Sequence, residues 1–154
     1  MNRKTWHEHW MQRCFQNSLM STCASGRSVG AVIVSSDNRS LSDGFNGVPA
    51  KFPHPVNCKR KDNNIPSGQC LDMCPCAHAE SNAIDNAARH GIAIKDSYLY
   101  CTNKPCVFCM GRIINSGIKK VFYIEDYPHE LTHLMADYAD VELVKLDGVK
   151  FEDN

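Results

Sequence analysis

Four side chains in the second half of this 154-residue chain have the residue types and spacing of a metal-dependent hydrolytic site. His78 and Glu80 form an H-x-E motif, and Cys106 and Cys109 form a P-C-x-x-C motif. Two thiolates and one imidazole supply three zinc ligands, which leaves the fourth tetrahedral position open to water. Zinc lowers the pKa of a bound water from about 15.7 towards about 7, so this site would supply hydroxide at neutral pH.

Both motifs begin predicted helices, over residues 78–90 and 106–116. Cys106 and Cys109 lie one helical turn apart, where the helix dipole and free N–H groups favour the thiolate. Glu80 is close enough to His78 to take a proton from the metal-bound water and deliver it to a ring nitrogen and a leaving amine. This motif pair is the signature of zinc deaminases that act on cytosine or adenine rings. The alternatives are a closed structural zinc site, in which Glu80 would have no role, and a chance occurrence of the two motifs.

The elements that must position these residues alternate along the chain. Helices are expected over 5–21, 78–90, 106–116 and 129–139, and strands over 28–34, a segment ending at Gly44, 97–102, 120–124 and 141–146. The first two strands read as an antiparallel hairpin, and the alternation after residue 78 predicts parallel strands with right-handed crossovers. Residues 45–76, rich in Asn, Gly and Pro, are expected to form a long loop. We therefore predict one α/β domain spanning residues 1–154.

Composition limits the classes of partner and the compartment. The chain has 17 Lys plus Arg and 17 Asp plus Glu, so its formal net charge is zero, and this argues against nucleic acid or an anionic membrane as a partner. We see no apolar run of about 20 residues and no secretory signal. The nine cysteines, an odd number, favour reduced thiols and metal ligation in the cytoplasm over a disulfide framework. Cys14 and Cys101 fit apolar faces and are expected in the core.

With these motifs the chain resembles the deoxycytidylate (dCMP) deaminases of the zinc cytidine-deaminase superfamily. The resemblance runs from about Ser21 to Tyr127 and is carried by the stretches STCASGRSVGAVIV, GFNGVPA, NIPSGQCLDMC, HAESNAIDNAARHGIAI and LYCTNKPCVFCMGRIINSGIKKVFY. It implies a three-layer α/β/α fold with a five-stranded mixed sheet. It also implies hydrolysis of dCMP to dUMP and ammonia, a homo-hexamer, activation by dCTP and inhibition by dTTP, with Mg²⁺ accompanying the triphosphate.

The resemblance also implies roles for individual residues. The four residues of the two motifs match the family's zinc ligands and proton shuttle. Asn46 matches an asparagine that touches the deoxyribose, although Asn46 followed by Gly47 is also typical of a turn. The backbone around Ala79 would contact the pyrimidine edge, and Arg89 matches a position associated with the effector and the subunit contact.

A second zinc site is expected from the other cysteines. Cys23, Cys58 and Cys74 fall where related small deaminases also carry cysteines. Such a site would offset the ordering entropy of the long loop, because metal-binding energy becomes folding energy. The fourth ligand stays open among three candidates: His54, Cys70 and Cys76. The alternative is that these thiols are small buried apolar groups.

Two other functions are consistent with the motifs. One is a deaminase that acts on a polynucleotide, such as adenosine in tRNA, which the neutral charge disfavours. The other is a catalytically silent zinc module that serves in assembly, which the intact Glu80 disfavours. Several cationic residues are candidates for binding a nucleotide phosphate, and the sequence does not distinguish among them: the run 59–61, Arg27, Lys104 and Arg112.

Overall fold

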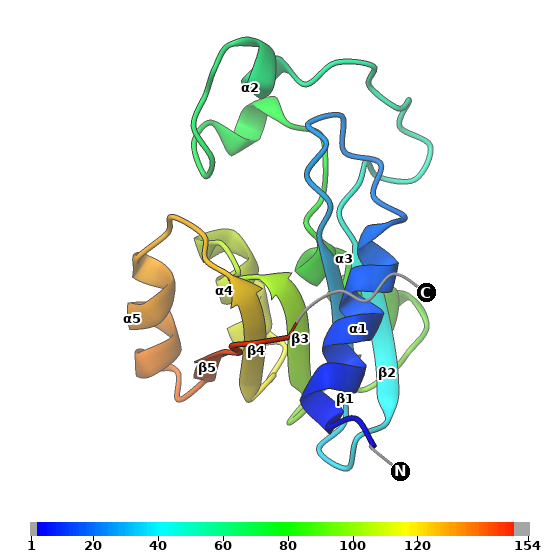
Figure 1. Ribbon diagram of the computed structural model, residues 1–154, viewed down its shortest axis with the longest axis vertical. Helices are drawn as coiled ribbons and strands as arrows, with labels where there is room; N and C mark the ends of the chain where they lie inside the picture. The colour runs from blue at the N-terminus through cyan, green and yellow to red at the C-terminus, as the bar shows by residue number, and fades with distance from the viewer. Residues whose placement is uncertain (1–2, 150–154) are drawn as a thin grey trace.

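The computed structural model describes residues 3–149, and its centre is one mixed sheet in the order β2-β1-β3-β4-β5 (Figure 1). β1 is antiparallel to both β2 and β3, whereas β3, β4 and β5 run parallel. The predicted hairpin and the parallel strands after residue 78 are therefore both present. The strands are β1 (Gly30–Val34), β2 (Ser40–Phe45), β3 (Tyr98–Asn103), β4 (Lys120–Glu125) and β5 (Glu142–Lys145).

Helices cover both faces of this sheet and confirm the three-layer α/β/α prediction. One apolar cluster joins α1 to the sheet through Met11 and Val32, and the other joins the remaining helices through Ala83 and Ile33. Among the described helices, none is long and apolar enough to cross a membrane. The layers are formed by α1 (Trp6–Ser18) on one face and by α3 (Ala79–Arg89), α4 (Val107–Asn115) and α5 (Leu131–Tyr138) on the other.

The segment from 45 to 76, expected to be a loop throughout, contains two short helices. These are α2 (Lys59–Asp62) and a 3₁₀ turn, η1 (Leu71–Met73). Helices of three or four residues are too short to show a hydrophobic period, so the sequence does not reveal them. A bridge between Gly47 and Ala77 joins the two ends of the segment, which projects beyond the sheet in Figure 1.

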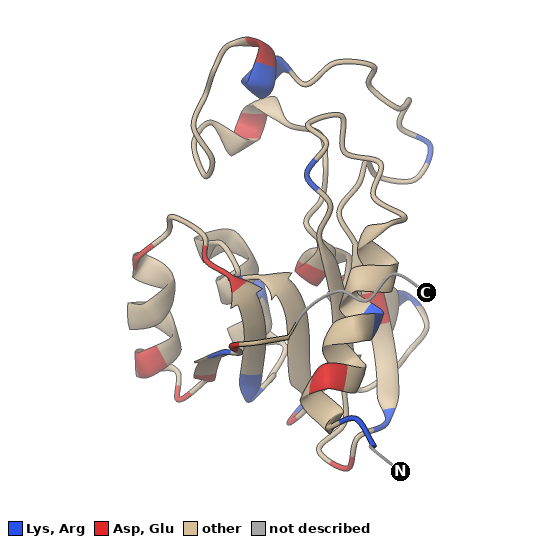
Figure 2. Cartoon of the chain, viewed as in Figure 1, with Lys and Arg blue, Asp and Glu red and all other residues tan. Residues whose placement is uncertain are grey.

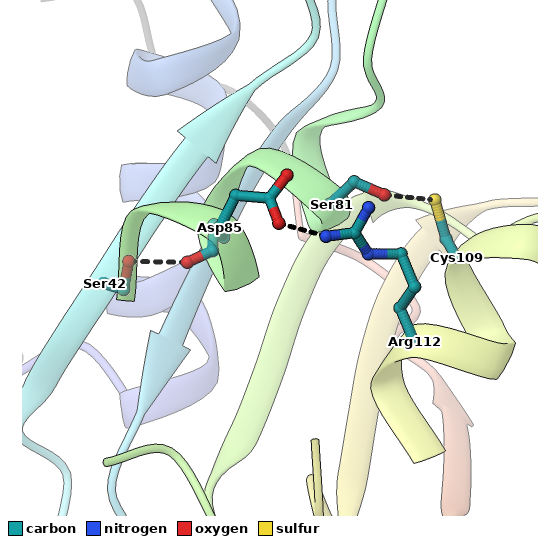
Figure 3. A network of polar contacts seen from close by, with 6 residues as sticks. Ser42, Ser81, Asp85, Cys109 and Arg112 are labelled. Atoms are coloured by element: carbon teal, nitrogen blue, oxygen red, sulfur yellow. Dashed lines mark hydrogen bonds and ion pairs between the residues drawn. The ribbon is translucent and has the colours of Figure 1, made fainter. Parts of the chain in front are cut away.

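Close contact between β2 and α3 fixes the start of α3. Gly44 permits this contact, since a Cβ atom there would lie 2.5 Å from the carbonyl oxygen of Ala79. The Ser42 hydroxyl donates a 2.7 Å hydrogen bond to the carbonyl oxygen of Ala83, as Figure 3 shows. The first turn of α3, which carries the H-x-E motif, is thereby held against the sheet.

Candidate functional site

The side chains of His78, Cys106 and Cys109 converge where α3 and α4 begin. His78 precedes the first residue of α3 and Cys106 precedes the first residue of α4. The Nδ1 atom of His78 lies 3.4 Å from the Cys106 sulfur and 3.5 Å from the Cys109 sulfur. Zinc bonds of about 2.3 Å to sulfur and 2.0 Å to nitrogen give tetrahedral S···N edges of about 3.5 Å. The spacing and the donor types therefore fit Zn²⁺.

The electrostatics of these three residues suit a cation. A hydrogen bond from Cys109 lowers the pKa of Cys106 to about 4, and the neighbouring His78 adds to this effect. The same Cys106 sulfur raises the pKa of His78. The same contact with Cys106 raises the pKa of Cys109, so negative charge is stabilised on the Cys106 sulfur even before a metal ion is present. Deprotonated thiols are the form that zinc binds, and zinc binding would release the Cys109 proton.

Polar contacts between α3 and α4 hold the two halves of the site together (Figure 3). The hydroxyl of Ser81 lies 3.4 Å from the Cys109 sulfur. On the outer side of the same two helices, Arg112 forms an ion pair with Asp85. Arg112 is therefore engaged on the surface, away from the cavity that His78 and Cys106 line.

Glu80 lies beside the three clustered donors and is 3% exposed. Burial raises the pKa of its carboxyl group to about 7. A carboxyl group with this pKa can accept or release a proton near neutral pH, as a general acid and base must. Glu80 is not one of the three clustered donors, and it lines the same cavity as His78 and Cys106.

This cavity, of about 240 Å³, extends from His78 and Cys106 to the projecting segment. Asn46 and Ala79 line it, as the resemblance leads one to expect. The Asn46 side chain is buried and holds two backbone groups: its Oδ1 accepts from the N–H of Val29 and its Nδ2 donates to the carbonyl oxygen of Arg27, both at 2.8 Å. These bonds use one of its two donors and one of its two acceptors, so Asn46 retains capacity for a ligand.

The second cysteine cluster differs in membership from the expected one. The sulfur atoms of Cys23, Cys74 and Cys76 lie within 4.8 Å of one another, whereas Cys58 is outside this group. Cys58 lines the cavity at the start of α2, sixteen residues before Cys74. Cys76 replaces it because the C-P-C sequence presents Cys74 and Cys76 together. The other candidate fourth ligands, His54 and Cys70, also lie outside the cluster.

Other predicted residues lie elsewhere. Arg89 is exposed at the end of α3 opposite to His78, away from the cavity. Cys14 and Cys101 are fully buried on opposite faces of the sheet, and all nine cysteines are free thiols.

Two residues beside the site were missed from the sequence. Tyr127 lines the cavity, and His129 contacts the backbone of Val107 at the start of α4. Both follow β4 in the chain. Since ligands of α/β sheets bind beyond the carboxyl ends of parallel strands, the position after a predicted parallel strand was the available signal.

Comparison with known proteins gives concordant matches. The sequence model described as cytidine and deoxycytidylate deaminase zinc-binding region matches residues 4–125. The chain is 35% identical over 150 residues to ComE operon protein 2 of Bacillus subtilis, covering 96% of this chain and 75% of that protein. It is 35% identical over 127 residues to the deoxycytidylate deaminase of Schizosaccharomyces pombe, covering 81% of this chain and 38% of that protein.

Among solved structures, the chain is similar to the dCMP deaminase of cyanophage S-TIM5 in complex with dCMP and dUMP. The TM-score is 0.77 at 29% identity, and the match covers 95% of this chain and 100% of that one. The fold, the motifs and the site geometry thus agree with the sequence matches.

Proposed function

The chain belongs to the cytidine and deoxycytidylate deaminase family, and from this we propose that it hydrolyses dCMP to dUMP and ammonia. The observation that carries the proposal is the convergence of three zinc-type donors with a buried carboxyl group whose pKa is about 7. The substrate assignment is supported by the similarity to a phage enzyme solved with dCMP and dUMP.

In the proposed reaction His78, Cys106 and Cys109 hold a catalytic zinc ion. When bound, zinc would supply Lewis-acid chemistry there by lowering the pKa of a water molecule. The Glu80 carboxylate would accept the first proton of the attacking water and donate it to the ring nitrogen. It would then take the proton of the hydroxyl group added to the amine-bearing carbon of the pyrimidine and deliver it to the amine, which leaves as ammonia while the carbonyl group forms. The backbone at the start of α3, around Ala79, lies beside Glu80 and faces the pyrimidine edge, and Asn46 orients the deoxyribose.

The deciding experiment is ammonia release from dCMP by the purified, zinc-loaded protein. Cytidine, deoxycytidine, cytosine and a tRNA transcript serve as competing substrates. We expect dCMP to have the highest kcat/KM, and Glu80→Gln to abolish turnover while the zinc content is retained. Faster turnover of cytidine or cytosine would contradict the nucleotide assignment. Turnover of the tRNA alone would identify a polynucleotide deaminase, and retained zinc without any turnover would favour an assembly module.

We extend the proposal to a second, structural zinc ion. Cys23, Cys74 and Cys76 have donor atoms close enough to share one ion, and they would join the chain before β1 to the chain before α3. Zinc there would stabilise the folded segment, because an unfolded chain does not hold the three sulfur atoms together.

We also propose the regulation that the resemblance implies. dCTP with Mg²⁺ would activate, dTTP would inhibit, and the active form would be a homo-hexamer acting in the cytoplasm. The exposed Arg89 is the proposed contact with the effector or a neighbouring subunit. Rate profiles with dCMP in the presence and absence of each triphosphate test this part, since linked sites give sigmoidal rates that the effectors reset.

A further inference from the structure

Cationic side chains gather at the cavity of a chain whose net charge is zero. Among the described residues that line it, Glu80 is the one carboxylate, against four cations: Arg27, Arg60, Lys61 and Lys104. Two of these cations come from α2, which is mostly blue in Figure 2 and belongs to the projecting segment. Such an excess of positive charge in a concave site attracts an anionic ligand.

Arg60 differs from the other cations because part of its guanidinium group lacks a partner. Its Nη2 atom donates to the carbonyl oxygen of Pro66 at 3.3 Å. Its Nε atom is buried and has no hydrogen-bond partner, the one such side-chain atom within residues 3–149. A buried donor without an acceptor destabilises the protein, so a ligand that brings an acceptor to this atom would gain binding free energy.

Arg60 also lines the same cavity as two of the proposed metal ligands, His78 and Cys106. A ligand that reaches these two residues with one end can therefore reach Arg60 with the other.

Two of the other cations already have partners. Arg27 donates to the hydroxyl of Ser67 at 2.7 Å, and its guanidinium lies 5.9 Å from the centre of the Tyr127 ring. Lys104 is buried, with its Nζ atom 3.3 Å from the Nε2 atom of His133. Arg60 therefore has the unmet donor, and a guanidinium edge matches the geometry of phosphate oxygens.

We propose that Arg60 binds the 5′-phosphate of the substrate and makes the enzyme prefer a nucleoside monophosphate to the corresponding nucleoside. This inference rests on the proposed function. It gives the projecting segment a role in specificity, because α2 places Arg60 on the cavity that is also lined by the start of α3 and by Cys106.

The test is the ratio of kcat/KM for dCMP to kcat/KM for deoxycytidine in the zinc-loaded protein. We expect Arg60→Gln to lower this ratio roughly 10- to 100-fold, the loss expected for one charge-assisted hydrogen bond, mainly through the KM for dCMP. Arg60→Lys should lower it less, because a lysine keeps the charge without the planar edge. Lys59→Gln is the matched control, since exposed Lys59 belongs to the same cationic run but does not line the cavity.

The outcomes separate the two proposals. If the wild-type protein prefers dCMP and Arg60→Gln changes the ratio no more than Lys59→Gln, the assignment of Arg60 is wrong while the function stands. If the wild-type protein deaminates neither compound, the proposed function fails. Calorimetric measurement of inorganic phosphate binding then tests whether Arg60 belongs to a phosphate site. Weaker phosphate binding by both Arg60→Gln and Arg60→Lys would support the site, and equal binding would overturn it.

Discussion

The Nε2 atom of His129 lies 2.8 Å from the carbonyl oxygen of Gly68. Its Nδ1 atom lies 3.3 Å from the backbone nitrogen of Val107, which can only donate. Nδ1 must therefore accept, and the neutral ring donates from Nε2 to Gly68. Through this one imidazole the projecting segment is joined to the first turn of α4, next to the proposed metal ligand Cys106.

Replacing His129 with alanine should loosen the projecting segment. The loss of a hydrogen bond worth about 1 kcal/mol predicts about a fivefold rise in the KM for dCMP, with kcat changed less. Hydrogen exchange of the backbone amides over residues 59–73 should become faster. His90→Ala, at an exposed position after α3, is the control. Unchanged exchange in His129→Ala would show that the contact with Gly68 does not hold the segment.

Replacing Asn46 with alanine should lower stability even without substrate. The change removes the acceptor for the Val29 N–H and the donor to the Arg27 carbonyl, both at a buried position. A buried group left without a partner costs about 1–3 kcal/mol, so urea unfolding of the zinc-loaded protein should report a loss of that size. Asn115→Ala, at an exposed position in α4, should change the free energy of unfolding by less than about 0.5 kcal/mol. Equal losses in the two variants would contradict a structural role for Asn46.

The metal content should distinguish Cys76 from Cys58. If Cys23, Cys74 and Cys76 hold a second ion, the purified protein contains two zinc ions per chain and Cys76→Ser contains one. Cys58→Ser should retain two, because Cys58 lies outside the cluster. Elemental analysis after gel filtration measures both. Loss of one zinc ion in Cys58→Ser would show that Cys58 is a ligand of the second ion. A content of one zinc ion in the wild-type protein would show that the second site does not exist.

The parts of the site encoded by short-range spacing were predictable. His78 and Glu80, and likewise Cys106 and Cys109, each pair the residue that precedes a helix with a residue of its first turn, so the position of the helix start places them. The strand pattern was sufficient for the α/β fold, which the observed sheet confirms. The parts that depend on tertiary contacts were not. The cysteine cluster depends on how the segment between Gly47 and Ala77 closes, and no local period describes that closure.

Residues after β4 illustrate the same limit. Tyr127 follows Cys106 by twenty-one residues, and only the parallel pairing of β3 with β4 brings the two to one edge of the sheet. The orientation of Arg60 likewise depends on α2, which is too short to leave a pattern in the sequence.

Glu80 gives the protein a characteristic dependence of stability on pH. Burial raises its pKa from an ordinary value of 4.5 to about 7, so the folded state holds the proton more tightly than the unfolded state. Below about pH 4.5 the carboxyl group is protonated in both states and costs nothing. Between pH 4.5 and 7 the unfolded chain ionises first, so the free energy of unfolding falls as the pH rises. Above pH 7 the full cost of the buried carboxylate is present.

Glu80→Gln should remove this cost in the zinc-free protein. Its free energy of unfolding should equal that of the wild-type protein near pH 4 and exceed it by up to about 3 kcal/mol above pH 7. Urea unfolding in a chelator across this pH range measures the difference. Zinc loading should reduce this difference in the free energy of unfolding, because a nearby cation favours the carboxylate and lowers the pKa of Glu80. A gap that does not vary with pH would mean that Glu80 is not held protonated by burial, and its capacity to move protons near neutrality would need another source.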